Sequence, residues 1–174
     1  MDAALDHRVR VERAVLIRAI VLHHSVSSPS TTLAQIDGWH KVRGFRCVGY
    51  QYVIRLEGEA AIIERGRSED ERGAHLKPSG LAEINNSNSI GVCIAGQHQS
   101  TAPHAAPPDR RLLTQAVELT AELCDHYGLT EEDVFGHREL RPTACPGDLL
   151  DLDEFRECVG SLLEQIRAAS NCDY

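Results

Sequence analysis

The feature that most constrains the fold is an apolar run, "AVLIRAIVLHHS", over residues 14–25, interrupted by a single arginine before its polar end. The run is rich in branched side chains and shows no alternation of polar and apolar residues, which is typical of a central strand buried on both faces. A second run of this kind, "SIGVCIAG", covers residues 89–96. Both segments predict buried strands of a sheet.

Three further strands are predicted by shorter apolar segments, at residues 47–55, 60–65 and 133–136. The first two are joined by the turn "LEGE" and are expected to form a hairpin. Residues 66–88, between the hairpin and the second buried strand, are polar, contain glycine and lack periodicity. Such a segment is typical of a long functional loop.

Three segments predict helices, at residues 31–44, 109–128 and 151–168. The first follows Ser/Thr capping candidates and ends at Gly44, and the second carries an apolar stripe that ends at Gly128. Strands and helices in this order predict the α/β class. No internal repeat or linker divides the chain, so we expect a single domain over residues 1–174 with its core at about residues 15–168.

The composition is that of an ordinary soluble globular protein, with 42% hydrophobic and 25% charged residues. The net charge of −8 argues against a nucleic-acid partner or an anionic membrane surface, because few counterions would be released from phosphates. No apolar run approaches the roughly 20 residues that span a bilayer. The start, "MDAALDHRVRVERAV", has no apolar core typical of a Sec signal. We therefore expect a cytoplasmic protein without membrane insertion.

The six cysteines do not predict a disulfide framework, because that inference applies to short secreted chains with a signal. Cys93 lies in a buried strand and Cys124 in a helical stripe, so both are expected as small core residues. If Cys145 binds a metal, five cysteines remain, and five cannot all pair within one chain. Synthesis in a reducing cytoplasm is the better interpretation.

The segment "GHRELRPTACPGD", residues 136–148, places His137 and a proline-flanked Cys145 in one turn-rich stretch. His23 and His24 end the first buried strand, and because side chains alternate faces, only one of them can point at a given site. Two imidazoles and a thiolate form a known ligand set of catalytic zinc, which activates water and polarises carbonyl oxygens. The alternative is a core thiol beside two surface histidines.

Four motifs carry a resemblance to a known family: "IVLHHS", "GWHKVRGFRCVGYQYVI", "NNSNSIGVCIAG" and "GHRELRPTACPGD". In this order they resemble zinc-dependent N-acetylmuramoyl-L-alanine amidases, which include short phage amidase-lysozymes and animal peptidoglycan recognition proteins. The resemblance covers roughly residues 15–158. It implies a central mixed β-sheet flanked by helices, with zinc in a surface groove that binds peptidoglycan. The reaction it implies is cleavage of the amide between the lactyl group of muramic acid and L-alanine.

The resemblance also assigns a cofactor and its ligands. It makes His23, His137 and Cys145 the ligands of Zn²⁺. His24 then faces away from the metal, as strand alternation requires of one member of the pair. In the alternative, His24 is the ligand and His23 faces away.

Other positions match residues around the metal in the family. Tyr50 matches a tyrosine whose hydroxyl assists proton transfer or steadies the oxyanion, and Tyr52, expected on the same strand face, is the competing candidate. Thr143 stands where phage members often carry a lysine, and is expected to donate a hydrogen bond to the tetrahedral intermediate. Trp39 and His40 are expected to pack a helix against the groove, with substrate contact as the alternative.

Three substrate contacts are predicted in or near the long loop. His75 matches a histidine of the groove wall, and its alternative is a solvated loop residue. Asn86, like Asn88, is expected either to line the groove or to cap a turn. Arg67 is expected to meet a carboxylate of the stem peptide, against the alternative of a solvated arginine.

The function expected from the resemblance is a phage or prophage endolysin, a zinc-dependent amidase whose partner is peptidoglycan. We expect a monomer that waits in the cytoplasm of the producing cell before lysis and acts on the periplasmic wall after release. Too few residues lie outside 15–158 for an independent wall-binding domain.

Three alternatives remain at this stage. A cytoplasmic amidase that recycles muropeptides would share the zinc ligands. A non-catalytic peptidoglycan receptor is disfavoured, because such family members typically lose the zinc cysteine, which is kept here as Cys145. A metal that only stabilises the fold is disfavoured by the retained Tyr50.

Overall fold

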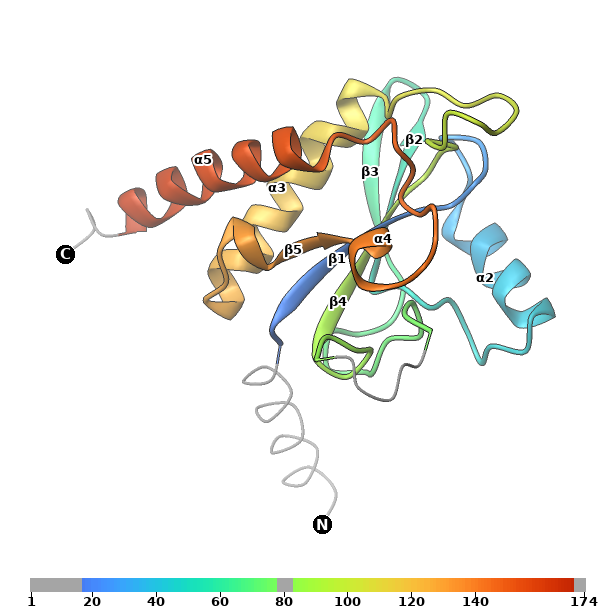
Figure 1. The fold of residues 1–174 in the computed structure, drawn as a ribbon, viewed down its shortest axis with the longest axis horizontal. Helices are drawn as coiled ribbons and strands as arrows, with labels where there is room; N and C mark the ends of the chain where they lie inside the picture. Colours follow the sequence, from blue (N-terminus) through green and yellow to red (C-terminus); the bar gives the residue numbers. More distant parts are fainter. Residues whose placement is uncertain (1–16, 78–82, 171–174) are drawn as a thin grey trace, which may run out of the picture.

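The computed structural model describes residues 17–77 and 83–170. Its strands are β1 (Ala19–His24), β2 (Tyr52–Glu57), β3 (Ala60–Arg65), β4 (Ser89–Ile94) and β5 (Val134–Gly136). Its helices are α2 (Leu33–Val42), α3 (Arg110–Tyr127), the short α4 (His137–Leu140) and α5 (Leu152–Ser170), with a 3-10 turn η1 (Glu131–Asp133). The predicted α/β class and the order of the main elements are confirmed (Figure 1).

The strands form one mixed sheet in the order β3-β2-β4-β1-β5. Strand β1 lies between β4 and β5 and runs parallel to both, whereas β2 runs parallel to β4 but antiparallel to β3. All residues of β1 and β4 are buried, as their apolar sequences predict. The carboxyl ends of β1 and β5 therefore lie side by side, which brings the residues that follow them to one edge of the sheet.

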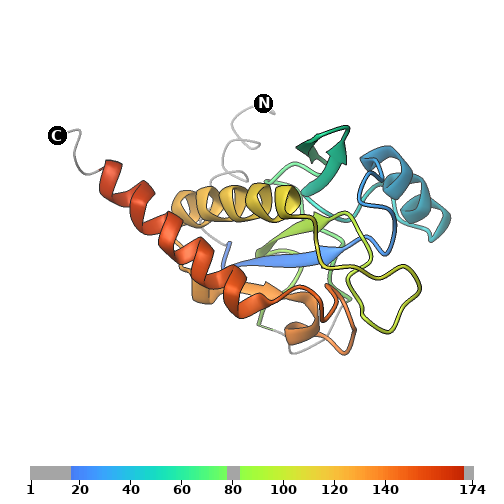
Figure 2. The same ribbon diagram turned by 90° about the horizontal axis from the view of Figure 1, so that it is seen from above.

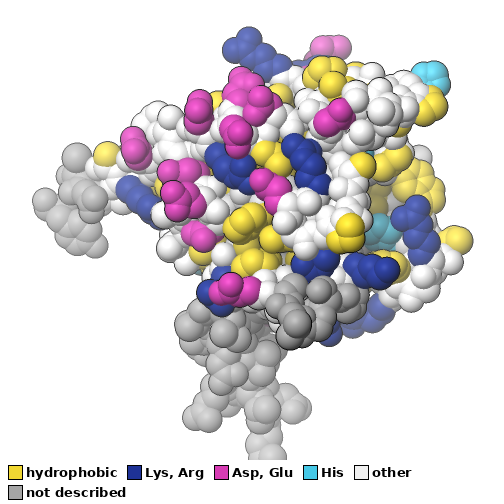
Figure 3. Space-filling view, viewed as in Figure 1, with side chains coloured by type: hydrophobic (Ala, Val, Ile, Leu, Met, Phe, Trp, Pro, Cys, Tyr) yellow, Lys and Arg dark blue, Asp and Glu magenta, His cyan; other side chains and the backbone are white. Residues whose placement is uncertain are grey.

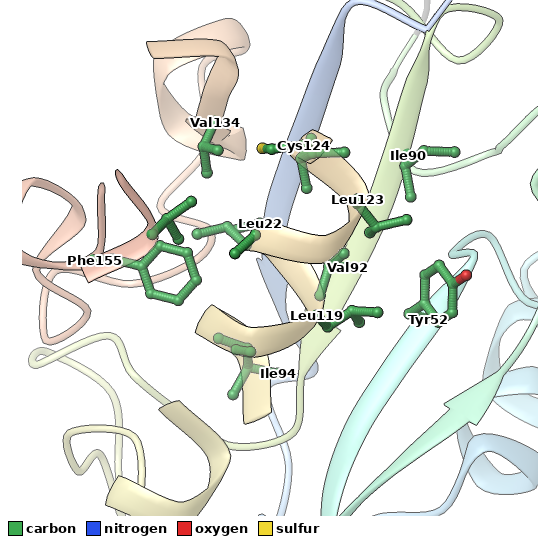
Figure 4. Close-up of a cluster of buried hydrophobic side chains, with 14 of the residues drawn as sticks. Leu22, Tyr52, Ile90, Val92, Ile94, Leu119, Leu123, Cys124, Val134 and Phe155 are labelled. Carbon is green, nitrogen blue, oxygen red and sulfur yellow. The ribbon is translucent and has the colours of Figure 1, made fainter. Parts of the chain in front are cut away.

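One face of the sheet packs against α3 and α5 through the larger of two hydrophobic clusters. Leu22, Val92 and Ile94 point from the strands toward Leu119 of α3 and Phe155 of α5 (Figure 4). Each large side chain buried in this way stabilises the fold by roughly 1.5–3 kcal/mol. The main core therefore lies on this face of the sheet, and α3 and α5 do not cover the opposite face.

The helix α3 begins and ends where its sequence predicts. Asp109 is its N-cap, with a side chain that accepts a hydrogen bond from the Arg111 N–H. Gly128 ends it in the left-handed conformation, at φ 67°, which glycine adopts without a steric penalty. Helices α3 and α5 pack together, and α2 lies apart from both (Figures 1 and 2).

The opposite face carries a smaller cluster made by Ile36 of α2 with Val48, Val53 and Cys93. Helix α2 begins at a capping box, in which the Thr32 side chain accepts from the Gln35 N–H and the Gln35 side chain accepts from the Thr32 N–H. The functional groups gather on this side, at the end of β1.

The predicted strand at residues 47–55 is wrong at its start, because β2 begins only at Tyr52. The preceding backbone bonds to groups outside the sheet ladder. The Val48 N–H donates to Asp37 Oδ1 at 2.6 Å, and the Gly49 N–H donates to His40 Nδ1 at 2.9 Å, both on α2. The predicted first strand also begins later, at Ala19, and residues 14–16 of that prediction lie outside the described residues.

Across residues 17–77 and 83–170, none of the helices has both the length and the apolar character needed to cross a membrane.

Candidate metal centre and groove

His23 and His24 end β1 and point to opposite faces of the sheet. His23 stands opposite Cys93 in the register and is buried, with its Nδ1 3.6 Å from the sulfur of Cys145. His24 turns to the other face, where its Nδ1 accepts from the His98 N–H at 3.2 Å. The alternation of the strand thus brings His23 to the cluster with Cys145, as the resemblance implies.

His137 and Cys145 reach His23 from the neighbouring strand and its following loop. Because β5 pairs with β1 and ends at Gly136, His137 emerges beside His23, with 4.7 Å between their ring centroids. The Arg138 N–H donates to the Cys145 carbonyl at 2.7 Å, which folds the loop back over the strand end. One potential ligand atom from each of His23, His137 and Cys145 lies within 4.8 Å of the other two.

The two imidazoles are neutral at physiological pH. Burial, followed by the nearby His75 and His137, holds the pKa of His23 well below its ordinary range. Burial lowers the pKa of His137 to about 4, and Arg141 acts in the same direction. Each neutral ring keeps one nitrogen lone pair, which a metal ligand requires.

The thiol of Cys145 is the group that a metal would change most. Burial raises its pKa to about 12, although the His24 N–H, 3.4 Å from the sulfur, and Arg138 act in the opposite direction. A thiolate there is therefore favoured only when a further positive charge is present, such as that of a bound cation.

A metal ion fits this set of donors. Within the described part of the chain, three buried side-chain polar atoms have no hydrogen-bond partner: His98 Nε2, Thr120 Oγ1 and His137 Nε2. The His137 atom belongs to the cluster, and a metal would give this otherwise costly orphan a partner. Two imidazoles and one thiol match a three-ligand catalytic zinc site.

Tyr50, and not Tyr52, lies beside the cluster. The Tyr50 ring centroid is 5.0 Å from that of His23, and the side chain lines the groove above it. Tyr52 belongs to the core on the other face, and its hydroxyl donates to Glu69. The prediction that the two tyrosines share a strand face is wrong, because β2 begins at Tyr52 and Tyr50 lies in the irregular segment before it.

The groove over the cluster has a volume of about 480 Å³. Thr143 lines it, and its Oγ1 accepts from the Cys145 N–H at 3.3 Å. His40 is buried and stacks on Phe45, which fits the predicted packing role. Trp39 is 41% exposed and lines the groove, which fits the alternative of substrate contact better than the packing role.

The three predicted substrate contacts lie in or beside the loop that borders this groove, but each is engaged by protein groups. His75 is 7% exposed and has its Nδ1 3.1 Å from His23 Nε2. Asn86 is buried, accepts from the His75 and Leu76 N–H groups and donates to the Leu76 carbonyl. Arg67 donates to the backbone carbonyls of Val48 and Arg72.

A second cavity, of about 680 Å³, adjoins the loop, and His75 lines both cavities. Four basic side chains line the second cavity against one acidic side chain, Glu71; they are Arg46, Arg67, Arg72 and Lys77. In the space-filling view, Lys and Arg flank a hollow at the right in which a histidine is visible, whereas most Asp and Glu lie in the upper left of the same view (Figure 3). The cavity therefore favours an anionic ligand despite the negative net charge.

Two supporting residues were not predicted from the sequence. Arg138 donates through its guanidinium to the carbonyls of Gly147 and Leu150, which anchors the loop that carries Cys145. Ser89, the first residue of β4, has its Oγ 3.4 Å from His75 Nε2. Both positions lie within motifs that carry the resemblance, but neither role could be read from the motif, because each depends on a partner 9 to 14 residues away along the chain.

Comparison with known proteins agrees with this geometry. The family model described as N-acetylmuramoyl-L-alanine amidase matches residues 13–148. The chain is 32% identical over 142 residues to the endolysin of Escherichia phage T7, covering 80% of this chain and 86% of the relative. It is 31% identical over 141 residues to a peptidoglycan-recognition protein of Drosophila melanogaster, covering 76% of this chain and 70% of the relative.

Among solved structures, the fold matches the N-acetylmuramoyl-L-alanine amidase LysC from Clostridium intestinale URNW, with a TM-score of 0.69 and 28% identity. The match covers 83% of this chain and 86% of that one. The expected mixed sheet flanked by helices is thus confirmed by the topology and by this likeness. Because the family model spans most of the chain and includes His23, His137 and Cys145, the chain belongs to the family of N-acetylmuramoyl-L-alanine amidases.

Proposed function

We propose that the protein is a zinc-dependent amidase that hydrolyses the bond between the lactyl group and L-alanine in peptidoglycan, and that it acts as a phage or prophage endolysin. The observation that carries this proposal is the convergence of two neutral imidazoles and a thiol at the floor of an open groove. Membership of the amidase family and the likeness to phage endolysins support it.

We assign His23 Nδ1, His137 Nε2 and the Cys145 sulfur as the atoms that hold Zn²⁺. When bound, the ion supplies Lewis-acid polarisation of the scissile carbonyl and activation of water. The orphaned nitrogen of His137 and the position of His23 Nδ1, 3.6 Å from the sulfur, support this assignment.

Two hydroxyl groups are proposed to stabilise the negative charge that develops on the carbonyl oxygen. Burial raises the pKa of Tyr50 well above its ordinary value, so its hydroxyl stays protonated and acts as a hydrogen-bond donor. Thr143 Oγ1 accepts from the Cys145 N–H, which leaves the hydroxyl hydrogen available for the substrate. Neither group then needs to change its protonation state before the reaction.

The substrate is proposed to lie across both cavities, with the scissile amide in the groove and the stem peptide over the basic cavity beside it. The four basic side chains of that cavity support recognition of a carboxylate of the stem peptide, with Arg67 among them. Arg67 and Asn86 also hold the loop, so their proposed contribution combines substrate contact with support of the groove wall.

The decisive experiment measures loss of turbidity of purified sacculi together with the products released. We expect new N-terminal L-alanine, loss of activity on chelation with recovery on adding Zn²⁺, and no activity for Cys145→Ser. Glycan cleavage without new N-terminal L-alanine, or full activity of Cys145→Ser, would contradict the proposal. Cys158→Ser, at an exposed position on α5, is the matched control and should remain active.

A parallel assay separates lysis from muropeptide recycling. An endolysin acts on intact sacculi, whereas a recycling amidase prefers soluble anhydro-muropeptides. We propose that the protein is a monomer that collects in the cytoplasm before lysis and then acts on the periplasmic wall. Fractionation of producing cells before and after lysis, with the molar mass measured by light scattering, tests both parts.

A further inference from the structure

A third histidine, His75, contacts the candidate ligand His23 but is not itself one of the three candidate ligands. His75 Nδ1 lies 3.1 Å from His23 Nε2, and the two rings meet edge to face at 82°. His23 directs its other nitrogen, Nδ1, toward the Cys145 sulfur. The two nitrogens of His23 are therefore divided, one toward the cluster and one toward His75.

The hydrogen bonds behind His75 determine which atom carries each proton. Ser89 Oγ donates its single hydrogen to the Asn85 carbonyl, at 2.7 Å. Toward His75 Nε2, at 3.4 Å, the same oxygen can act only as an acceptor. His75 then carries its proton on Nε2 and presents the lone pair of Nδ1 to His23.

The proton of His23, the candidate metal ligand next to His75, is fixed in the same way. Because His75 Nδ1 accepts, His23 must donate through a proton on its Nε2. A neutral imidazole has one N–H, so the lone pair of His23 is left on Nδ1, the atom that faces Cys145. We propose that His75 is a positioning residue that holds His23 in this tautomer and ring orientation before a metal binds; the inference rests on the proposed metal chemistry.

The surrounding backbone keeps room for the His75 ring. A Cβ added at Gly91, inside β4, would lie 2.7 Å from His75 Cγ and Cδ2, and one added at Gly73 would lie 2.5 Å from Cδ2. Glycine inside a strand weakens the strand, so the close approach of this ring gives a reason for Gly91. Asn86 accepts from the His75 N–H at 2.9 Å and fixes the backbone behind the ring.

This role differs from the substrate contact expected from the sequence. A residue that only touches substrate would change the KM and leave metal binding unaltered. A positioning residue changes metal affinity and the tautomer of His23 even without substrate, since partners of this kind are typically worth about 10- to 100-fold in metal affinity or activity.

The test uses His75→Leu, His75→Asn and a control at an exposed histidine of α3, His126→Leu. Zinc affinity is measured by competition with a chromophoric chelator, and the His23 tautomer is read from ring ¹⁵N shifts of the metal-free protein. We expect His75→Leu to weaken zinc binding about 10- to 100-fold and to give a mixture of His23 tautomers. His75→Asn, which keeps an acceptor near the position of Nδ1, should restore most of the affinity, and His126→Leu should match wild type.

Wild-type affinity in a folded His75→Leu protein, with His23 still protonated on Nε2, would overturn the inference. If His75→Leu does not fold, two milder variants decide. Ser89→Ala removes the acceptor behind His75, and Gly91→Ala displaces its ring; both should weaken zinc binding, whereas Gly38→Ala, which meets no atom within 4 Å, should not. Wild-type affinity in both milder variants would also overturn it.

The two proposals can fail separately. If wild-type protein binds no zinc, the metal chemistry of the proposed function fails. The ¹⁵N shifts of His23 in the metal-free protein would still show whether His75 selects its tautomer.

Discussion

Tyr50 and Tyr52 are two positions apart, yet they belong to different parts of the molecule. Tyr50 lies 5.0 Å from His23, measured between ring centroids, whereas Tyr52 donates to Glu69 in the core behind the sheet. Glu69 also accepts from Tyr127 of α3 at 2.6 Å, so Tyr52 helps to fasten the loop to the helix. One tyrosine thus serves the site and the other the fold.

Replacing Tyr50 by phenylalanine should lower kcat by about 10²–10³, because a donor to the developing oxyanion is lost while the ring still packs. Zinc affinity should stay at the wild-type value. Tyr52→Phe is the matched control, with unchanged kcat and a loss of about 1 kcal/mol in the free energy of unfolding. Steady-state kinetics and urea unfolding check both variants, and equal kcat values for the two would contradict the assignment.

Thr143 offers a second, weaker donor that lines the same groove as Tyr50. Thr143→Val keeps the shape and removes the hydroxyl, so we expect kcat to fall roughly tenfold, or about 1.4 kcal/mol of transition-state stabilisation. Thr143→Ser keeps the hydroxyl and should retain most of the rate. Kinetics on a soluble muropeptide distinguish the two, and a Val variant as fast as wild type would exclude a role for this hydroxyl.

At the scale of elements, helix α2 ties the groove to the sheet. Its His40 accepts from the Gly49 N–H, and its Asp37 accepts from the Val48 N–H, which holds the segment that presents Tyr50. The predicted extended strand fails here because the backbone finds these side-chain partners in place of a neighbouring strand. Tyr50 is therefore positioned by a loop that is held by side chains of α2, and not by the backbone hydrogen bonds of the sheet.

The contribution of the α2 capping box to the free energy of unfolding should be measurable separately. Thr32→Ala removes the acceptor of the Gln35 N–H and should lower the free energy of unfolding by about 1 kcal/mol. Thr32→Ser preserves the acceptor and should stay close to wild type. Denaturant unfolding of the two variants gives the comparison, and equal stability of Ala and Ser would mean that the cap contributes nothing.

At the scale of the whole molecule, the proposed metal joins segments that are distant in sequence. His23 ends β1, His137 begins α4, and Cys145 follows in a loop that Arg138 anchors. A ligand that binds only the folded state raises stability by mass action. Bound zinc should therefore hold together the edge of the sheet where the groove opens.

Removal of the metal should lower the melting temperature. With free zinc at 100 times its Kd, the stabilisation is about 2.7 kcal/mol, which corresponds to roughly 5–10 °C for a chain of this size. Thermal unfolding with a chelator and with added zinc measures the difference. Cys145→Ser should show a much smaller response, and an equal response in this variant would argue against ligation by the thiol.

Much of the fold could be predicted locally. The apolar runs predicted β1 and β4, and the stripe between Asp109 and Gly128 predicted α3 within a residue or two, because burial and capping act on neighbouring residues. The exposure of Trp39 and the burial of His75 could not be predicted in this way. Both depend on which distant segment covers a side chain, and no local pattern records that.

The sequence by itself determined the α/β class, the buried strands and, through the resemblance, the three candidate metal ligands. Periodicity, capping and motifs depend on residues that are close together in sequence, so they can be recognised without a structure. Only the tertiary structure decided that Tyr50 and not Tyr52 faces the cluster, and that His75 stands behind His23 with Ser89 behind it. These choices rest on hydrogen bonds and close contacts between segments far apart in sequence. Such contacts exist only once the sheet has brought its strand ends to one edge.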